Sequence, residues 1–587
     1  MCGIVGFDIN GKAFELEELL NNCTRKLGHR GPDNQGTFIR KSIHIGHTRL
    51  KIIDLSEGAN QPLNYQHKVI VSFNGEIYNF EALKKALQKL SYSFKTQSDT
   101  EVIAAAYLAW GIHCLDRFEG MFALCIYDLS KNEIFLARDI FGKKPLYYTT
   151  APFFSFSSEL STFTELLPTL NTRLEAVNQF LSIGYVLSPL TMYEEVQAIP
   201  PAHYLKYHVP SQSITISKFW NYADTFRAKK KYLHKEDAIA ETRTLLFEAI
   251  EKRTLGDVPY GIFLSAGIDS GAIACILKKV HKLSPPCFNI GFKQTKYDES
   301  GFASQLAQEL GLPFQSIDLS SIAFNKFEKY VKEIDNLSFD NSSYPIYELA
   351  KMASQQVKFV LTGDGSDELF GGYITYRADT INRNMKAIIP LLKKLGISTL
   401  IISASANHND KIGWGTKLNR FFKGIDPNYR KAHYNWRRVF SIEERIEILG
   451  KQHEELIRDT DPFYTFNMHY EEVQDLDLLD QHLYVDAKTW LSENNLMKLD
   501  VNTMAHGLEA RSPFLDRKLV SHVASLDISY KKDKAHLKKV LSDYLPAKYL
   551  NHKKSGFNSP VHLWLNSTSD EFQAYTKFIF DKKYANP

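Results

Sequence analysis

The chain has 587 residues, a size at which two or more domains are expected, and 44% of its residues are hydrophobic while 24% are charged. Its formal net charge is +4 with acidic and basic residues interspersed, so nothing favours binding to nucleic acid or an anionic membrane. There is no signal-peptide pattern, no apolar run long enough to cross a membrane and no CxxC pair among the six cysteines, so we expect a cytoplasmic enzyme with reduced thiols.

The first candidate catalytic residue is Cys2. If Met1 is removed, Cys2 carries both a thiol and a free α-amine. The reference pKa of an α-amine is about 7.7–8.0, which allows it to act as the base for that thiol. The alternative is an ordinary cysteine that stays behind Met1, and two residues alone do not exclude it.

The first part of the chain, up to about residue 204, has short runs of β-type residues separated by Gly, Asn and Asp. We predict strands over residues 43–45, 69–73, 122–127 and 134–137, and helices over residues 15–27, 80–89 and 101–110. Strands with helices on both sides favour a layered α/β/β/α sandwich. We assign this domain to residues 1–210.

The pattern changes after a polar, basic stretch without clear periodicity, residues 211–235, which we predict to be a linker. Strand and helix patterns then alternate, which favours a doubly wound parallel α/β sheet. This second domain is assigned to residues 236–587, and the C-terminal third of the chain has a mostly helical pattern. The predicted helices cover residues 238–253, 272–281 and 300–310, and the strands cover residues 260–264 and 287–290.

Five motifs of the first domain follow Cys2 in a distinctive order. They are GHRGPD at 28–33, HTRL at 47–50, FNGEIYN at 73–79, SD at 98–99 and ARDIFGKKPLYY at 137–148. Each is weak evidence alone, but together they resemble the glutaminase domain of the N-terminal-nucleophile (Ntn) hydrolase type of glutamine amidotransferase. The resemblance implies an Ntn-hydrolase sandwich with Cys2 as the nucleophile. It also implies an oxyanion hole made by the Asn74 amide and the Gly75 N–H, where one donor contributes about 10²–10³ in rate.

The same resemblance implies a set of residues that bind glutamine. Arg49 is expected to pair with the α-carboxylate as a planar fork, while Glu76 and Asp99 are expected to bind the α-ammonium group. Leu50 and Ile53 complete the expected pocket. In isolation, Arg49 or Asp99 would be assigned to a surface salt bridge, and it is the surrounding motifs that favour a binding role.

The second candidate site begins with SAGIDS at residues 265–270, directly after the predicted strand 260–264. It resembles the SGGxDS pyrophosphate loop of the ATP pyrophosphatase enzymes. Backbone N–H groups and Ser hydroxyls at a helix N-terminus form an anion-binding site. The alternative is an ordinary glycine turn with Ser or Asp as the helix cap, which has a similar sequence. Ala266 replaces the first glycine of the family pattern, and this requires a negative φ at Ala266.

The stretch LTGDGSDELFGGY, residues 361–373, resembles the second signature of the asparagine synthetase family. The resemblance implies that Asp269 and Asp367 hold Mg²⁺ against the phosphates of ATP, a task that suits hard oxygen ligands. The ATP-binding residues that it implies are Leu264, Ser265, Gly267, Asp269, Ser270, Ile290, Thr362 and Gly363.

Two further stretches fit the same family, residues 496–516 and KKSGF at 553–557. Lys554 lies where the family has a lysine that contacts the phosphates, and its alternative assignment is a solvated surface lysine. Asp364 occupies a catalytic position at which family members have Glu or Asp, so it does not decide the substrate.

The resemblance covers nearly the whole chain and implies a complete reaction. Aspartate, ATP and glutamine would give asparagine, AMP, pyrophosphate and glutamate, with ammonia passing through a dry channel between the domains. An amidotransferase of the same family that acts on another carboxylate, in surface-polymer or secondary-metabolite biosynthesis, is the main alternative. A β-lactam synthetase-like enzyme would not need Cys2, and a non-catalytic sensor would need broken ligands. The oligomeric state stays open, with a homodimer as one expectation.

Overall fold

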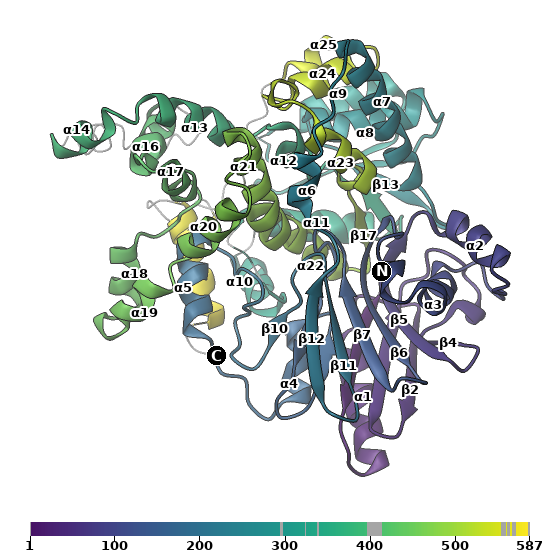
Figure 1. Ribbon diagram of the computed structural model, residues 1–587. Coiled ribbons are helices and arrows are strands. Elements are labelled where there is room, and N and C mark those ends of the chain that lie inside the picture. The colour runs from purple at the N-terminus through teal and green to yellow at the C-terminus, as the bar shows by residue number, and fades with distance from the viewer. Residues whose placement is uncertain are drawn as a thin grey trace.

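The computed structural model describes residues 2–293, 298–322, 324–336, 338, 340–395, 414–552, 559, 564–565 and 571–584. Two six-stranded antiparallel sheets belong to the first part of the chain, and a five-stranded parallel sheet belongs to the second (Figure 1). The expected fold class, an α/β/β/α sandwich followed by a parallel α/β domain with a helical C-terminal part, is confirmed.

The first sheet of the sandwich has the order β10-β8-β9-β1-β3-β2, and the second has the order β12-β11-β7-β6-β5-β4. The strands of the first sheet are β1 Gly3–Asp8, β2 Asn34–Arg40, β3 Ile43–Arg49, β8 Tyr147–Thr149, β9 Ser155–Ser157 and β10 Gln197–Ala198. Those of the second are β4 Leu63–Tyr65, β5 Val69–Ile77, β6 Gly120–Asp128, β7 Glu133–Arg138, β11 His203–His208 and β12 Ser213–Lys218.

Helices cover the outer face of each sheet. Helix α1 (Ala13–Lys26) packs on the first sheet, and α2 (Phe80–Lys89) and α3 (Asp99–Trp110) pack on the second. The two sheets face each other through apolar side chains such as Ile4 and Ile70. Because β1 begins at Gly3 and β5 runs through Asn74 and Gly75, the sandwich brings the first and second sheets together beside Cys2.

The segment that we predicted to be a linker, residues 211–235, contains regular structure. Strand β12 pairs antiparallel with β11 at the edge of the second sheet. Helix α6 (Tyr222–Arg227) follows it and buries Tyr222 and Phe226. The Lys229 ammonium donates a hydrogen bond to Asp480 Oδ2 over 2.6 Å rather than standing free in solvent. Elements of six residues are too short to show a periodicity, which is why the sequence suggested a linker.

The parallel sheet has the order β15-β14-β13-β16-β17. Its chain order reverses between β13 and β16, and ligands of doubly wound sheets bind in the crevice at such a point. The strands are β13 Tyr260–Phe263, β14 Cys287–Gly291, β15 Phe314–Asp318, β16 Phe359–Leu361 and β17 Glu509–Arg511. The helices around them include α7 Lys235–Lys252, α8 Ile268–Lys279, α9 Ser300–Leu310, α11 Ser343–Ala353 and α12 Ser366–Phe370.

The remaining helices form the C-terminal helical part, and several of them extend away from the sheets (Figure 1). None of the described helices is long and apolar enough to cross a membrane. All six cysteines are buried and none forms a disulfide. The main helices of this part are α13 Ile374–Asn384, α16 Trp414–Gly424, α17 Tyr429–Asn435, α18 Ile442–Leu449, α20 Phe463–Glu472, α21 Leu478–Asp486, α22 Met497–Met504, α23 Arg517–Ser525, α24 Ala535–Leu541 and α27 Glu571–Ile579.

Candidate active sites

The residues predicted to bind and hydrolyse glutamine surround one pocket. Cys2 lies in its wall just before β1, and the Cys2 nitrogen donates a hydrogen bond to Asn74 Oδ1 over 3.2 Å. That nitrogen becomes the α-amine once Met1 is removed, so its position beside the thiol is already fixed. The other predicted residues in the wall are Arg49, Leu50, Ile53, Gly75, Glu76 and Asp99.

An unused hydrogen-bond donor stands beside the thiol. The Asn74 side-chain nitrogen, Nδ2, is buried and has no hydrogen-bond partner among the described residues. At Gly75, where φ is +153°, an added Cβ would lie 2.0 Å from the Met121 carbonyl oxygen, so only glycine fits. Burial raises the pKa of the Cys2 thiol, against the opposing effects of the Leu50 main chain and Arg49. The thiol therefore needs a base, and the vacant donor suits a developing oxyanion.

The guanidinium of Arg49 is engaged by the loop that follows β3. Its Nη1 donates to the Ser56 carbonyl oxygen over 2.9 Å and to Asn60 Oδ1 over 2.8 Å. Its Nη2 donates to the carbonyl oxygens of Ile53, over 3.2 Å, and Asp54. Arg49 thus holds this loop in place. To bind the α-carboxylate of glutamine through two hydrogen bonds, the guanidinium would have to give up some of its hydrogen bonds to the loop.

The two acidic residues of the pocket are both buried, which disfavours their charged forms. Asp99 lies at the start of α3 and accepts a hydrogen bond from the Ile77 N–H over 3.0 Å; burial raises the pKa of Asp99 to about 7. Burial also raises the pKa of Glu76 well above its usual value, although the Arg511 guanidinium opposes this. Arg511 Nη2 lies 3.0 Å from Glu76 Oε1.

Arg511 belongs to β17 of the parallel sheet, so the second domain contributes a cation to the edge of the glutamine pocket. Its Nε donates to Glu509 Oε1 over 2.5 Å, and its Nη1 donates to the Arg253 carbonyl oxygen over 3.0 Å. Arg511 lies in the stretch 496–516, which resembles the asparagine synthetase family. The residues around it in the sequence do not indicate a partner in the first domain.

The second candidate site lies at the carboxyl ends of β13 and β16, where the order of the parallel sheet reverses. The SAGIDS loop is held by its hydroxyls: the Ser265 N–H donates to Ser270 Oγ over 3.0 Å, and the Gly267 N–H donates to Ser265 Oγ over 3.2 Å. Ala266 is buried and keeps a negative φ, so the missing glycine is accommodated. Leu264, Ile290, Thr362 and Gly363 lie at or just beyond the carboxyl ends of β13, β14 and β16.

The two residues predicted to hold Mg²⁺ converge on one point. Lys534 Nζ lies 2.7 Å and 2.8 Å from the two oxygens of Asp269, and 2.7 Å from Asp367 Oδ1. Burial lowers the pKa of Lys534, but the two carboxylates outweigh this and raise it, so the ammonium is charged. A pair of carboxylates arranged around one cation fits the oxygen ligands that Mg²⁺ prefers.

Lys534 is the residue of this site that the sequence did not reveal. It lies in the left-handed region, with φ of +55°, immediately before α24. In the sequence it is one lysine of a basic run, KKDK, which resembles a solvated surface segment. Asp364 lies in the loop between β16 and α12, close in sequence to Asp367. Lys554, which we predicted to contact the phosphates, lies outside the described residues.

Comparison with known proteins finds two family domains in this chain. Residues 1–220 match a glutamine amidotransferase domain, and residues 241–578 match asparagine synthase. The chain belongs to the asparagine synthetase family. An asparagine synthetase of Bacillus subtilis is 32% identical over 97% of this chain and 89% of its own length. A putative asparagine synthetase of Methanocaldococcus jannaschii is 34% identical over 69% of this chain and 84% of its own length. The amidase chry2 of Gibberella zeae is 27% identical over 96% of this chain and 90% of its own length.

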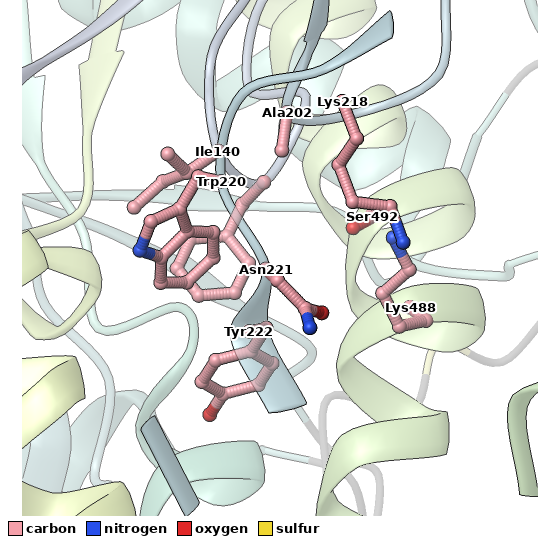
Figure 2. Close-up of a pocket in the computed structure, with 9 residues that line it drawn as sticks. Ile140, Ala202, Lys218, Trp220, Asn221, Tyr222, Lys488 and Ser492 are labelled. Atoms are coloured by element: carbon pink, nitrogen blue, oxygen red, sulfur yellow. The ribbon is translucent and has the colours of Figure 1, made fainter. Parts of the chain in front are cut away.

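This member of the asparagine synthetase family has a further small pocket where the two domains meet (Figure 2). Its lining combines aromatic walls, such as Trp220 and Tyr222, with Lys218 and Lys488. Burial and the nearby Lys218 lower the pKa of Lys488, and Lys218 Nζ lies 3.7 Å from Glu472 Oε2. No residue predicted for the glutamine or ATP site lines this pocket.

Proposed function

We propose that this chain is a glutamine-dependent asparagine synthetase, which releases ammonia from glutamine at Cys2 and transfers it to aspartate activated by ATP. The observation that carries the proposal is the convergence of Asp269, Asp367 and Lys534 at the switch point of the parallel sheet. Two carboxylates and a charged lysine beside a hydroxyl-rich loop suit the binding of a nucleoside triphosphate with its metal ion. Membership of the family supports the same assignment.

In the glutaminase half, the α-amine of Cys2 takes the thiol proton, and the sulfur attacks the side-chain amide carbon of glutamine. The Asn74 amide and the Gly75 N–H then stabilise the oxyanion. Ammonia leaves, and water releases glutamate from the thioester. Asp99 and Glu76 hold the α-ammonium group of glutamine, while Arg49 holds the loop and the α-carboxylate.

In the synthetase half, Asp269 and Asp367 would hold Mg²⁺, which neutralises charge on the phosphates when it is bound. Ser265, Gly267 and Ser270 present hydroxyl and N–H donors to the phosphates. Lys534 is placed to turn from the carboxylates to the phosphate oxygens as ATP enters. The aspartate side chain attacks the α-phosphorus, pyrophosphate leaves, and ammonia then displaces AMP to give the amide. We assign Asp364 and Lys554 to this step from their positions in the family motifs.

The ammonia has to stay unprotonated between the two sites, which favours a route without bulk water. Tyr78 and Met121 of the first domain form a buried apolar cluster with Met504 of the second. This cluster adjoins Gly75, because the Met121 carbonyl oxygen lies directly against that glycine. It supports a dry start to the passage.

The acceptor carboxylate is the least constrained part of the proposal. The similarity to amidase chry2 extends over 96% of this chain, so an amidotransferase acting on another carboxylate is the second candidate. The test is to incubate the purified protein with ATP, Mg²⁺ and glutamine, to supply aspartate or one of a panel of carboxylates, and to follow pyrophosphate release. Release that requires aspartate supports an asparagine synthetase. Release with another carboxylate and none with aspartate would establish the second candidate instead.

A further inference from the structure

Exposed apolar side chains gather on three helices of the C-terminal helical part, α13, α14 (Ile389–Lys394) and α16. Figure 1 shows these helices projecting from the body of the molecule, with α14 at the outer end. We call them the helical arm, residues 374–395 and 414–424. A group of exposed apolar residues on one part of a surface marks a contact site, whereas single ones need no explanation. Those of the arm are 41% to 65% exposed and are Ile374, Ile381, Ile388, Leu391, Leu395 and Leu418.

Helix α13 has the opposite orientation to an ordinary surface helix, because polar side chains face inward. Its buried side chains are Tyr376, Asp379 and Asn382. The Tyr376 hydroxyl donates a hydrogen bond to Asp486 Oδ2 over 2.8 Å. Asn382 Nδ2 donates to the Asp426 carbonyl oxygen over 2.9 Å. These bonds fix the rotation of the helix, and the apolar residues are left to face outward.

The exposed apolar residues follow helical spacing. Ile374 and Ile381 are seven residues apart on α13, which is nearly two full turns, so they lie on one side of that helix. Ile388, Leu391 and Leu395 follow one another at spacings of three and four, which places them on one side of α14. The arm therefore presents an apolar outer face where a surface helix normally presents polar side chains.

The same arm is strongly basic. It contains eight Lys and Arg residues and a single acidic residue, Asp379, which is 2% exposed. Its formal charge of +7 exceeds the +4 of the whole chain, so the rest of the chain is net negative. This is why the charge of the whole chain did not indicate an anionic partner.

Most of these basic side chains are available for binding. Arg377 is paired with Asp533, and Lys393 is paired with Asp426. Five others are exposed and have no ion pair among the described residues. They are Arg383, Lys386, Lys394, Lys417 and Lys423.

We propose that the helical arm docks on an anionic lipid surface, with its apolar side chains entering the boundary between head groups and acyl chains. Helices that lie on a membrane combine an apolar side with Lys and Arg residues in this way. Clusters of about four to eight basic residues on such helices attract anionic lipids. The arm would lie on the membrane and not cross it, and none of the described helices is long and apolar enough to cross one.

Two other occupants fit this face less well. A second copy of the chain, related by two-fold symmetry, would place one basic arm against another, and like charges repel. A nucleic acid would satisfy the charges with its phosphate oxygens, but it would leave the exposed isoleucines and leucines without an apolar partner. An anionic lipid surface satisfies both the charges and the apolar side chains.

The arm is continuous with the second candidate site. Helix α13 begins directly after Tyr373, whose hydroxyl donates a hydrogen bond to Glu368 Oε1 over 2.6 Å. Glu368 is the next residue after Asp367. Docking therefore brings the synthetase half to the lipid surface, and it does not depend on which carboxylate the enzyme amidates.

The test is co-sedimentation of the purified full-length protein with sucrose-loaded vesicles. One set of vesicles contains equal amounts of phosphatidylglycerol and phosphatidylcholine, and the other contains phosphatidylcholine alone. We expect binding to the anionic vesicles and binding about tenfold weaker, or less, to the neutral ones. Raising the NaCl concentration should release the protein from the anionic vesicles, because salt screens the attraction.

The apolar part of the contact is tested by the double variant Ile388→Ser, Leu391→Ser. It should bind the anionic vesicles about tenfold more weakly or worse. Both side chains are exposed, so the melting temperature should equal that of the parent protein. Phe14→Ser is the matched control, because Phe14 is 77% exposed on α1, far from the arm in Figure 1 and next to Glu15. It should bind vesicles as the parent does.

The electrostatic part is tested by the double variant Lys386→Glu, Lys394→Glu. Both lysines are exposed and unpaired among the described residues, so reversing their charge should leave the fold intact. Binding to the anionic vesicles should fall about tenfold or more and should depend less on NaCl.

A protein that binds neither kind of vesicle would overturn the proposal. Equal binding by Ile388→Ser, Leu391→Ser and by Phe14→Ser would overturn it as well, since the contact would then lie elsewhere. Light scattering tests the second copy: a parent dimer that the serine variant converts to a monomer, without vesicle binding, would assign the face to self-association. Binding to duplex DNA without vesicle binding would assign it to nucleic acid.

Discussion

Cys2 acts as a nucleophile only after its thiol loses a proton, and its burial makes that loss harder. The Cys2→Ala variant should therefore have no measurable glutamine-dependent amide formation. Synthesis from added ammonium salt should survive within about twofold, because the second site does not use the thiol. The measurement is product formation with each nitrogen source. Equal losses with glutamine and ammonium would contradict the two-site assignment.

The carboxyl of Asp99 should make glutamine binding depend on pH. Its pKa is raised to about 7, so it is neutral below that pH and charged above it. Only the charged form attracts the α-ammonium group, so glutamine should bind more tightly as the pH rises from 6 to 8. Calorimetry in the Cys2→Ala background excludes the thiol from the measurement. Asp99→Asn should bind glutamine more weakly and lose most of the pH dependence of the affinity, with Glu76 supplying the remainder. If the affinity of this variant changed with pH as much as that of the parent protein, Asp99 would not be the group responsible.

Asp269 and Asp367 should behave as one unit, since both face a single cation. Asp→Asn at either position keeps the size of the side chain but removes the charge, and each variant should reduce carboxylate-dependent pyrophosphate release by about 10²-fold or more. Glutamine hydrolysis should persist in both. The double variant should release pyrophosphate only slightly more slowly than the more impaired of the two single variants. Losses that multiply as independent effects would contradict a shared ion.

At the scale of elements, the end of β16 sets the position of Asp269. A Cβ added at Gly363 would lie 2.7 Å from the Asp269 Cβ and 3.1 Å from the Ser270 N–H, so Gly363→Ala must push the SAGIDS loop away. We expect pyrophosphate release to fall at least tenfold while glutamine hydrolysis stays unchanged. Gly301→Ala on α9 is the control, because its added Cβ meets nothing within 4 Å. A Gly363→Ala enzyme with parent activity would show that the crevice tolerates movement of the loop.

The regular elements were largely predictable because each has a period. The run of β-type residues in 69–73 and the amphipathic pattern in 80–89 appear as β5 and α2. Strand β12 and helix α6 were missed because each has six residues and one lies at a sheet edge, where exposed side chains resemble a linker. The candidate site residues could be named because they belong to short motifs, which do not depend on a period. Arg49 ends β3, Asp99 begins α3, and Asn74 and Gly75 lie inside β5.

Lys534 and Arg511 show what local sequence could not supply. Lys534 lies far along the chain from Asp269, and only the packing of α24 against the crevice brings its ammonium to that carboxylate. Arg511 meets Glu76 across a domain interface. Such pairings depend on tertiary placement, and a single sequence carries no periodicity or spacing that reports it.

At the scale of the whole molecule, Arg511 connects the two halves. Arg511→Lys keeps the charge but loses the planar fork that reaches Glu76 and Glu509 together. Removing part of a buried ion network costs up to about 3–5 kcal/mol, so the melting temperature should fall. Glutamine KM should rise about tenfold, since Glu76 without its partner is more often protonated. A lowered melting temperature with an unchanged glutamine KM would limit Arg511 to a purely structural role.

The Glu76–Arg511 pair also bears on how these halves can be recombined. A glutaminase cut from this chain at residue 220 and grafted onto another enzyme would carry Cys2, Asn74 and Asp99 with it. It would leave behind the guanidinium that faces Glu76. In such a chimera the pKa of Glu76 would rise further, and Glu76 would be protonated unless the host supplied an arginine that reaches it. Exchange of the glutaminase half therefore requires the host to supply the cation that Arg511 of β17 provides here.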